Sequence, residues 1–321
     1  MELLPYKVLE VLPSVKETQD WHLTKTHVPD LWLKAAGEGV RVGVADTGTS
    51  LNHPDLIHSY NNIKDFTGDG PDDVQGHGSH CSGIIAARAN DLGVVGVAPS
   101  CRIYHAKVLG NRGQGNDRDI VAGIEWLIAQ GCTIISMSLG SQDESPYISQ
   151  CISAHKGIDF VVAAGNSGPS NNTQEWPSRH PNAIAVAAVD SDGRIASFSS
   201  RGPHIAIAAP GVDILSTFKG KEYARLSGTS MATPFVAGCL ALARSAGDQR
   251  PAKEILKGAA IPQQDASAYG WGLINPTDLI NVSNPKPNPD TYTIAFNNGM
   301  KLIVPKGVKI INDNDPTFTP G

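Results

Sequence analysis

The sequence predicts an α/β fold with a mostly parallel central sheet and helices on both faces. Short apolar stretches rich in Val, Ile and Ala indicate strands buried on both sides, because they lack the apolar–polar alternation of half-exposed strands. Helical periodicity between these stretches gives the strand–helix alternation typical of α/β proteins. The predicted strands are residues 41–46, 102–109, 133–139, 159–165 and 183–190.

Three helices follow from capping signals and periodicity. Asn116 suits the N-cap of a helix over residues 117–130, whose apolar residues recur on one face before a glycine. A Ser-Pro pair opens a second predicted helix over 145–157, since proline fits the first helical position. A third helix is predicted over 231–244, with a proline in its first turn, where a missing N–H costs little.

Length and composition suit one large domain with additions at both ends, or two domains of modest size. The chain has 321 residues, of which 40% are hydrophobic. We expect an N-terminal extension over 1–18, a main domain over 19–283, and a linker with a β-hairpin over 284–321. In this last segment a proline-rich stretch precedes two apolar runs around Asn-Asn-Gly.

Charge and apolar content exclude two classes of partner. The net charge of −5 comes without a basic run, so nucleic acid is not an expected partner. No apolar stretch approaches the roughly 18 residues that span a bilayer, so no membrane partner is expected. The N-terminus lacks a basic stretch followed by an apolar one, which predicts a cytoplasmic protein. The mature form of a secreted protein is the alternative.

The five cysteines include no Cys-x-x-Cys pair, and most lie in apolar stretches. Buried free thiols are therefore favoured over disulfides. The cysteines are Cys81, Cys101, Cys132, Cys151 and Cys239.

Three residues beside glycines are candidates for chemistry. Asp46 ends the first predicted strand, where functional groups gather in such sheets, although a helix cap or solvated turn is the alternative. His77 opens a helical pattern and could bind a metal together with His80, but a third ligand is missing. Ser230 precedes the third predicted helix, whose unpaired amides and dipole would favour a developing oxyanion.

The order Asp, His, Ser is that of subtilisin. The sequence blocks around these residues closely resemble those of subtilisin-like serine proteases over about residues 20 to 282: VADTGTSLNHPDL, GHGSHCSGIIAA, SMSLGS, AAGNSG and GTSMATPFVAG. The resemblance implies a subtilisin-like three-layer α/β/α fold. It also implies a serine endopeptidase that hydrolyses peptide or protein substrates.

The resemblance assigns a role to each matching residue. Ser230 would attack the scissile carbonyl, His77 would take and return the proton, and Asp46 would fix the His77 tautomer. Asn166, in AAGNSG, matches the oxyanion-hole asparagine of the family and would act with the Ser230 backbone N–H. Cys81 resembles the cysteine that proteinase-K-like members carry after the His motif.

A substrate would lie extended between two backbone segments, as in the family. Glu175 aligns with the floor of the pocket for the P1 residue, the residue before the cut. A carboxylate there would favour Lys or Arg at P1, unless Glu175 points into solvent. The matching substrate-binding residues are Gly113, Gln114, Gly115, Ser138, Leu139, Gly140, Ala164, Gly165 and Glu175, with Ser141 adjoining.

One loop matches the tight calcium site of the family, and Ca²⁺ is the cofactor that the resemblance implies. Side-chain oxygens would come from two residues and backbone carbonyls from three. A further ligand would come from Glu17, Gln19 or Asp20. The loop ligands are Asp55, Arg88, Asn90, Leu92 and Val94.

The N-terminus resembles the short extension of intracellular subtilisins. Leu3, Leu4, Pro5 and Tyr6 match its Leu-Ile-Pro-Tyr motif with one conservative change. In that group the extension lies across the active site and inhibits it until it is cut; a disordered terminus is the alternative. The group is usually dimeric, so a homodimer is an alternative to a monomer.

Two other functions stay open at this stage. A narrow processing protease would mature one partner and use the C-terminal hairpin for docking. A catalytically silent homologue would only hold peptides in its cleft.

Overall fold

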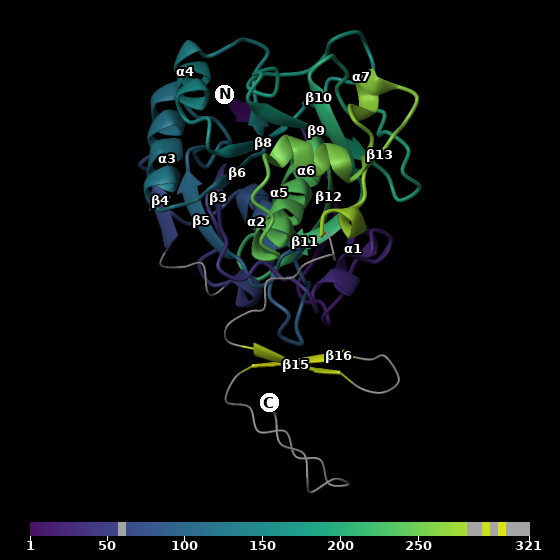
Figure 1. Ribbon diagram of the computed structural model, residues 1–321. Helices are drawn as coiled ribbons and strands as arrows, with labels where there is room; N and C mark the ends of the chain where they lie inside the picture. Colours follow the sequence, from purple (N-terminus) through teal and green to yellow (C-terminus); the bar gives the residue numbers. More distant parts are fainter. Residues whose placement is uncertain (57–61, 281–290, 296–300, 306–321) are drawn as a thin grey trace, which may run out of the picture. The chain divides into compact units, whose positions relative to one another are not determined.

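The computed structural model describes residues 1–56, 62–280, 291–295 and 301–305, in two compact units, Met1–Asn281 and Val282–Gly321. The larger unit is built on a nine-stranded sheet of order β13-β14-β10-β9-β8-β6-β3-β5-β4 (Figure 1). All neighbouring strands are parallel except the β13–β14 pair at one edge. The strands are β3 (Arg41–Asp46), β4 (Ile63–Asp65), β5 (Arg102–Lys107), β6 (Ile134–Met137), β8 (Asp159–Ala163), β9 (Ala183–Val189), β10 (Ile205–Pro210), β13 (Ala260–Ile261) and β14 (Leu273–Ile274).

Helices cover both faces of this sheet. Successive residues of one strand enter different cores: Ile134 packs in one apolar cluster and Ile135 in another. The first cluster contains α2 (His77–Ala86), α5 (Thr229–Ser245) and α6 (Ala252–Gly258). The second contains α3 (Asp117–Ala129) and α4 (Pro146–Ala154). The predicted three-layer α/β/α fold is confirmed.

Helix α5 lies in the middle of the first layer. Every residue from Thr229 to Ala243 is buried, so this helix is covered on all sides. Its residues are mostly small or apolar on every face, which is expected for a helix that is buried on all sides. Its first turn is therefore fixed by packing from every direction.

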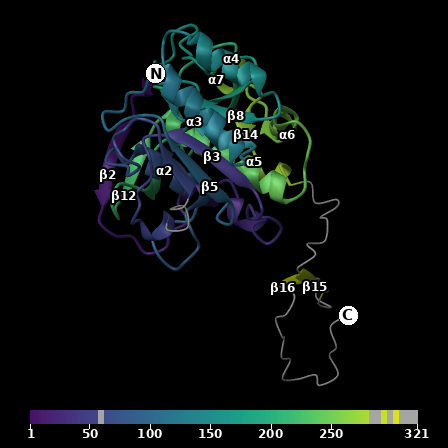
Figure 2. The ribbon, with the colours of Figure 1, turned by 90° about the vertical axis from the view of Figure 1, so that its left-hand side faces the viewer.

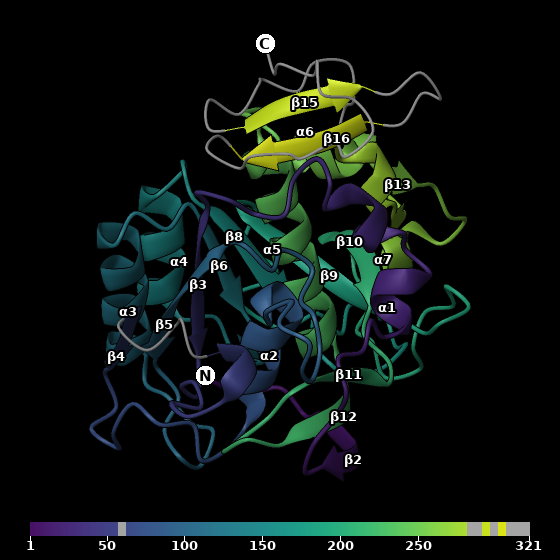
Figure 3. The same ribbon diagram turned by 90° about the horizontal axis from the view of Figure 1, so that it is seen from below.

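Two small antiparallel sheets involve the N-terminus. Strand β1 (Glu2–Leu3) pairs with β7 (Leu139–Gly140). Strand β2 (Lys7–Leu12) adds to the edge of β12 (Tyr223–Ser227), which pairs on its other side with β11 (Ile214–Thr217). Figures 2 and 3 both show β2 beside β12. The N-terminal extension is thus part of the folded larger unit.

The remaining elements are short. The larger unit also holds α1 (Trp21–Thr24), η1 (Val28–Leu31), α7 (Ala266–Tyr269) and η3 (Pro276–Asp278). The smaller unit contains β15 (Thr291–Ala295) antiparallel to β16 (Lys301–Pro305). The Asn-Asn-Gly turn and the proline-rich linker lie outside the described residues. Among the helices that the structure describes, none has the length and apolar character to cross a membrane.

The predicted caps are confirmed, and several predicted boundaries are wrong. Asn116 accepts a hydrogen bond from the Asp119 N–H, and Ser145 accepts one from the Ile148 N–H. Helix α5 starts at Thr229, two residues before the predicted start, so Ser230 lies within the first turn. The predicted strands also end early, since β5 stops at Lys107 and β8 at Ala163. The segments beyond them form loops that line one edge of the sheet.

Candidate active site

Asp46 and His77 form a buried hydrogen-bonded pair. Asp46 is the last residue of β3, and His77 is the first residue of α2. His77 Nδ1 lies 2.8 Å from Asp46 Oδ1, and the Thr47 N–H donates to the same oxygen at 2.8 Å. Since the carboxylate can only accept, Nδ1 carries the proton and Nε2 faces away from Asp46.

The electrostatics of this pair favour the charged form of both partners. Burial opposes a charge on either group. The Asp46 carboxylate nevertheless raises the pKa of His77 well above its usual value. In return, despite burial, His77 lowers the pKa of Asp46. The imidazolium form that a general base adopts during proton transfer is therefore stabilised.

Asp73 holds the start of α2 in place, and sequence reasoning missed it. Its Oδ1 accepts from Thr47 Oγ1 at 2.9 Å and from the Gly76 N–H at 2.8 Å. Its Oδ2 accepts from the Ser79 N–H at 2.8 Å and from the Ser79 hydroxyl at 2.7 Å. Thr47 Oγ1 in turn accepts from the N–H of the residue after His77. Asp73 thus ties the loop after Asp46 to the helix of His77. An acidic residue four positions before His77 was the available signal.

His80 has a structural position. Its Nε2 lies 3.1 Å from the Ile214 carbonyl oxygen and 3.0 Å from that of Ala224. Both neighbours are acceptors, so this nitrogen must carry a proton and cannot ligate a metal. Burial lowers the pKa of His80 to about 3. Among the described residues, His80 belongs to no group of side chains that could hold a metal together with His77.

Ser230 is buried in the first turn of α5. Its backbone oxygen accepts from Ser138 Oγ at 2.9 Å and from Cys81 Sγ at 3.4 Å, which fixes the turn. Its own hydroxyl donates to the Ser138 carbonyl at 3.5 Å. His77 Nε2 has no hydrogen-bond partner among the described residues. A rotation of the Ser230 side chain would be needed to join the two, and catalytic hydrogen bonds often tighten only when substrate is bound.

Asn166 is fixed on one side and points into the cleft on the other. Its Oδ1 accepts from the Thr229 N–H at 3.0 Å and from Thr229 Oγ1 at 3.1 Å. Its Nδ2 donates to the Pro5 carbonyl oxygen at 2.6 Å. The amide donor therefore faces the region in front of the α5 N-terminus, where an oxyanion would be stabilised.

Residues 1–3 lie as a strand between the two predicted substrate-binding segments. The Leu3 N–H donates to the Gly113 carbonyl at 2.9 Å, and the Gly115 N–H donates to the Met1 carbonyl at 3.1 Å. Glu2 forms a bridge with Gln114, and on the other side β1 pairs with Leu139 and Gly140. Gly113 has φ +76°, a conformation that favours glycine, and a Cβ there would lie 2.9 Å from Leu3 Cδ1.

Leu4 and Glu175 meet at Gly140. Leu4 is 1% exposed, and a Cβ on Gly140 would lie 2.6 Å from Leu4 Cδ2 and 3.1 Å from Glu175 Oε2. Glu175 is 6% exposed and accepts from Ser167 Oγ at 2.9 Å, so it points inward and not into solvent. Burial raises the pKa of Glu175.

The segment Ala164–Gly165 forms the neighbouring wall. The Ala164 carbonyl accepts from the Glu175 N–H at 2.9 Å, and the Gly165 N–H donates to Thr229 Oγ1 at 3.3 Å. Ala164, Gly165 and Gly140 thus lie around Glu175, and Leu4 reaches the same place at Gly140.

Tyr6 covers the Asp46–His77 pair. Its ring centroid lies 4.9 Å from that of His77, and its hydroxyl donates to Gln75 Oε1 at 2.8 Å. Beyond Tyr6 the chain continues into β2 on the edge of β12. The extension therefore passes the candidate catalytic residues: residues 2–3 pair with the substrate-binding segments, Tyr6 lies on His77, and residues 7–12 pair with β12.

The predicted calcium loop lies around a buried carboxylate and donates N–H groups to it. Asp55 is fully buried and accepts from the Val94 N–H at 3.0 Å and from Asn90 Nδ2 at 3.2 Å. Glu17 accepts from the Asn90 and Asp91 N–H groups, both at 2.7 Å.

Burial, and in part the charge of Glu17, raises the pKa of Asp55. Neither carboxylate forms an ion pair with a described residue. Two carboxylates without a cation fit a Ca²⁺ site. Of the other predicted ligands, Asp20 pairs with Arg225 instead, at 3.1 Å.

All five cysteines are free and buried. Cys81 lies on α2 with its Sγ 3.9 Å from His77 Nδ1. Burial raises the pKa of the Cys81 thiol. The thiol is therefore a packing group beside His77 in its neutral form.

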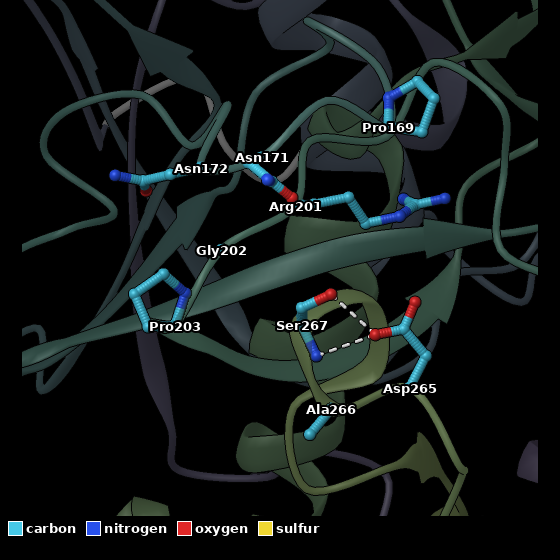
Figure 4. A pocket seen from close by; sticks show the side chains of 9 residues that line it. All are labelled: Pro169, Asn171, Asn172, Arg201, Gly202, Pro203, Asp265, Ala266 and Ser267. Carbon is cyan, nitrogen blue, oxygen red and sulfur yellow. Dashed lines mark hydrogen bonds between the residues drawn. The ribbon is translucent and has the colours of Figure 1, made fainter.

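A cavity of about 650 Å³ lies away from these residues (Figure 4). Its charged side chains already have partners: Arg201 donates to the Ser199 carbonyl at 2.7 Å, and Asp265 accepts from the Ser267 N–H and hydroxyl as the N-cap of α7. None of the predicted site residues lines it. Its lining residues are Pro169, Asn171, Asn172, Arg201, Gly202, Pro203, Asp265, Ala266 and Ser267.

Comparison with known proteins agrees with this geometry. Residues 37–272 match the Subtilase family, Peptidase_S8. Subtilisin BL of Lederbergia lenta is 40% identical over 266 residues, which are 79% of this chain and 96% of that protein. An alkaline protease of Shouchella clausii is 39% identical over 273 residues, 82% of this chain and 70% of that protein. An intracellular serine protease of Paenibacillus polymyxa is 38% identical over 253 residues, 75% of this chain and 77% of that protein. The chain therefore belongs to the subtilase family of serine endopeptidases.

Proposed function

We propose that this chain is a calcium-stabilised endopeptidase that uses Ser230 as nucleophile and is restrained by its own N-terminal extension. The hydrogen bond from Asn166 Nδ2 to the Pro5 carbonyl carries this proposal, because it joins the candidate oxyanion donor to the extension. The proposal has four parts: the triad, the substrate cleft, the calcium site and the restraint.

The triad would work through His77 Nε2. This nitrogen takes the Ser230 proton as Oγ attacks the scissile carbonyl, while Asp46 holds the Nδ1–H. The oxyanion accepts hydrogen bonds from Asn166 Nδ2 and the Ser230 N–H. His77 then protonates the leaving amine, and a water molecule hydrolyses the acyl-enzyme by the same route.

The cleft would bind substrate as an added strand. The backbone groups of 113–115 and 139–140, which pair with residues 1–3, suit any extended peptide. Glu175 beside Leu4 supports a preference for Lys or Arg at P1, since a cation there would pair with a buried carboxylate.

The extension would restrain the enzyme by occupying the cleft in a displaced register. Leu4 fills the space beside Glu175, yet the carbonyl at Asn166 belongs to Pro5, one residue further along. A substrate would place the pocket residue and the reacting carbonyl in the same amino acid. Proline, with its fixed φ and missing N–H, favours this displacement.

Ca²⁺ would be held by the Asp55 carboxylate, the Asn90 amide oxygen and the carbonyls of Arg88, Leu92 and Val94. Glu17 is the favoured ligand from the N-terminal segment, because it already binds the same loop. The ion would neutralise two carboxylates and fasten residues 16–18 to the domain.

A cytoplasmic location is supported by the Leu-Leu-Pro-Tyr motif and by the relative named as intracellular. A homodimer is carried over from the resemblance alone, and light scattering would test it. A narrow processing role would require the hairpin segment, so deleting residues 284–321 should spare casein cleavage while it abolishes cleavage of the partner.

The decisive test is labelling of Ser230 by a fluorophosphonate. The full chain is compared with a form that begins at Pro13, which loses β1 and β2 but keeps Glu17 at the calcium loop. We expect labelling only in the shortened form with calcium. Ser230→Ala provides the blank, and full-length Glu10→Ala is the matched control, since Glu10 is exposed and outside the cleft.

Each other outcome has a definite meaning. Equal labelling of both lengths would remove the restraint and keep the protease. No labelling of either folded form would favour the silent peptide-binding homologue.

A further inference from the structure

Outside the candidate active site, three metal-ligating side chains converge between two helices. Glu125 lies on α3, Cys151 lies on α4, and His155 follows the last residue of α4. Figures 1 and 2 show α3 and α4 side by side. One ligand atom from each side chain lies within 4.8 Å of the others. Only two groups of this kind occur in the part of the chain that the structure describes, and the other contains His77.

The hydrogen bonds of His155 leave one nitrogen directed at this cluster. His155 Nδ1 lies 2.9 Å from the Cys151 carbonyl oxygen and must donate to it. Nε2 lies 3.4 Å from Glu125 Oε2. Two lone pairs cannot face each other at this distance, so a proton or a metal ion belongs between them. A backbone carbonyl that fixes the Nδ1 proton is the usual second partner of a metal-bound histidine.

The three side chains lie close enough for a tetrahedral ion to bind after small side-chain rotations. Zinc with bonds of about 2.3 Å to sulfur and about 2.0–2.1 Å to nitrogen or oxygen holds its ligand atoms about 3.3–3.6 Å apart. The structure has 3.7 Å between Cys151 Sγ and Glu125 Oε1 and 3.4 Å between His155 Nε2 and Glu125 Oε2. With one ligand atom taken from each side chain, the three atoms lie within 4.8 Å of one another, so a bound ion would draw them together by about an ångström at most.

The cluster is also reachable from solvent. Cys151 is 6% exposed, whereas His155 is 25% and Glu125 50% exposed. An ion can therefore arrive from the Glu125 side and meet a buried sulfur at the inner end. The cluster lies at the C-terminal end of α4, where the helix dipole favours a cation.

We propose that Glu125, Cys151 and His155 form a binding site for Zn²⁺ or a similar thiophilic divalent ion, with water as the fourth ligand. Sulfur, imidazole and carboxylate together suit Zn²⁺ and not the oxygen-seeking Ca²⁺. The ion takes the place of the thiol proton of Cys151, so Zn²⁺ binds to a thiolate and H⁺ is released to solvent.

The site would fasten the far ends of α3 and α4. Both helices follow segments of the substrate cleft, since α3 begins after Gly115 and α4 begins after Gly140. At their near ends, Ser145 Oγ donates to Asp117 Oδ2 at 2.6 Å. A bound ion would supply the second tie and would stiffen the two walls against each other.

Cobalt binding tests the site without any need for activity. The full chain carries Ser230→Ala to prevent self-digestion and Cys81→Ala to remove the thiol beside His77, and calcium is kept in the buffer. We expect one equivalent of Co²⁺ to give a thiolate-to-cobalt absorption that one equivalent of Zn²⁺ abolishes, with release of protons on metal binding.

Variants at the three ligands complete the test. Cys151→Ser should abolish the absorption. His155→Gln and Glu125→Gln should each weaken metal binding by at least about tenfold. Loss of a residue that only hydrogen-bonds to a metal ligand already weakens metal affinity by about 10–100-fold. The controls are Cys132→Ser, another buried thiol, and His204→Gln, an exposed histidine; both should bind as the parent does.

Three results would overturn the proposal. The first is a folded parent that shows no thiolate absorption with Co²⁺. The second is an absorption that Cys151→Ser leaves unchanged, and the third concerns Glu125. Because Glu125 is half-exposed, Glu125→Gln tests the site even if the Cys151 variant fails to fold; unaltered affinity there would exclude Glu125 as a ligand and sink the three-ligand site.

Discussion

The side-chain amide of Asn166 is held between Thr229 and Pro5. Its oxygen accepts from the first residue of α5 at 3.0 Å, and its nitrogen donates to the extension at 2.6 Å. The donor that would stabilise an oxyanion is therefore positioned before any substrate arrives, which is what electrostatic catalysis requires.

Asn166→Ala should lower kcat by about 10²–10³-fold in the form that begins at Pro13, with little change in KM. This magnitude is the one measured for the oxyanion asparagine of subtilisin, a member of the same family. Peptide hydrolysis kinetics measure it. Asn171→Ala, in an exposed loop, is the control. A change confined to KM would mean that Asn166 only binds the ground state.

The activity should fall on the acidic side because His77 must be neutral to accept the Ser230 proton. Asp46 raises the pKa of His77 above 6.5, so kcat/KM should rise as pH increases through that raised value. Asp46→Asn removes the charge and should move the acid limb to lower pH. It should also lower kcat by about 10⁴-fold, as the corresponding change does in a serine protease of another fold. An acid limb that does not move would contradict the pairing as its cause; Asp143→Asn is the control.

Glu175→Gln should reduce the preference for Arg over Leu at P1 by about tenfold. A charge-assisted hydrogen bond is worth about 1.5–3 kcal/mol, and about 1.4 kcal/mol corresponds to a factor of ten. Matched peptides that differ only at P1 measure the ratio of kcat/KM. Glu144→Gln, at an exposed carboxylate, should leave the ratio unchanged. If the parent already cleaves both peptides equally, the basic preference is wrong.

Removal of calcium should lower the unfolding temperature of the Ser230→Ala protein. An ion present at about 100 times its Kd adds about 2.7 kcal/mol of stability. Asp55→Asn should unfold at the temperature of the chelated parent and show no further response to chelator. Asp192→Asn, remote from the loop, should respond as the parent does. A chelator effect that persists in Asp55→Asn would place the ion elsewhere.

Asp20→Asn should destabilise the fold by about 2 kcal/mol at neutral pH. Despite burial, His22, the Leu215 N–H and Arg225 lower the pKa of Asp20 from 3.8 to about 2, and one pKa unit corresponds to about 1.4 kcal/mol. A lowered pKa stabilises the folded state above pH 3.8, and this stabilisation is lost as the pH falls toward 2. Urea unfolding of the Ser230→Ala protein should therefore show a difference that shrinks with acidity. The exposed Asp30→Asn is the control, and a pH-independent difference would point to packing instead.

The sequence predicted the sheet and its helices because each depends on local signals, whereas the meeting of Asp46 with His77 was implied by the resemblance to subtilisin-like proteases. Apolar runs mark β3 and β6, and Asn116 and Ser145 mark helix starts through their own side-chain hydrogen bonds. Glycines beside Asp46 and His77 mark close backbone approach. These signals lie within a few residues of the element they predict.

Other features depend on contacts between distant segments and could not be predicted in the same way. The residues of strand β2 are almost all exposed and do not alternate between apolar and polar, so the sequence does not mark a strand there. The strand forms because its backbone pairs with the edge of β12. The spacing of Cys151 and His155 is visible in the sequence, but Glu125 joins them from another helix. Asp73 acts through Thr47, whose position depends on the end of β3.

The pairing of β2 with β12 has a consequence for the length of chain that the protease should prefer. When residues 1–12 leave, β12 loses its partner strand over Tyr223–Ser227. The backbone N–H and C=O groups on that edge of β12 then become exposed to water. A substrate that continues in extended form over the length matching Tyr6–Leu12, about seven residues beyond the cut, can satisfy them, whereas a short peptide cannot. Such stretches occur in unfolded polypeptides and seldom in compact proteins. The enzyme would then select its targets by their state of folding as much as by the residue at the cut.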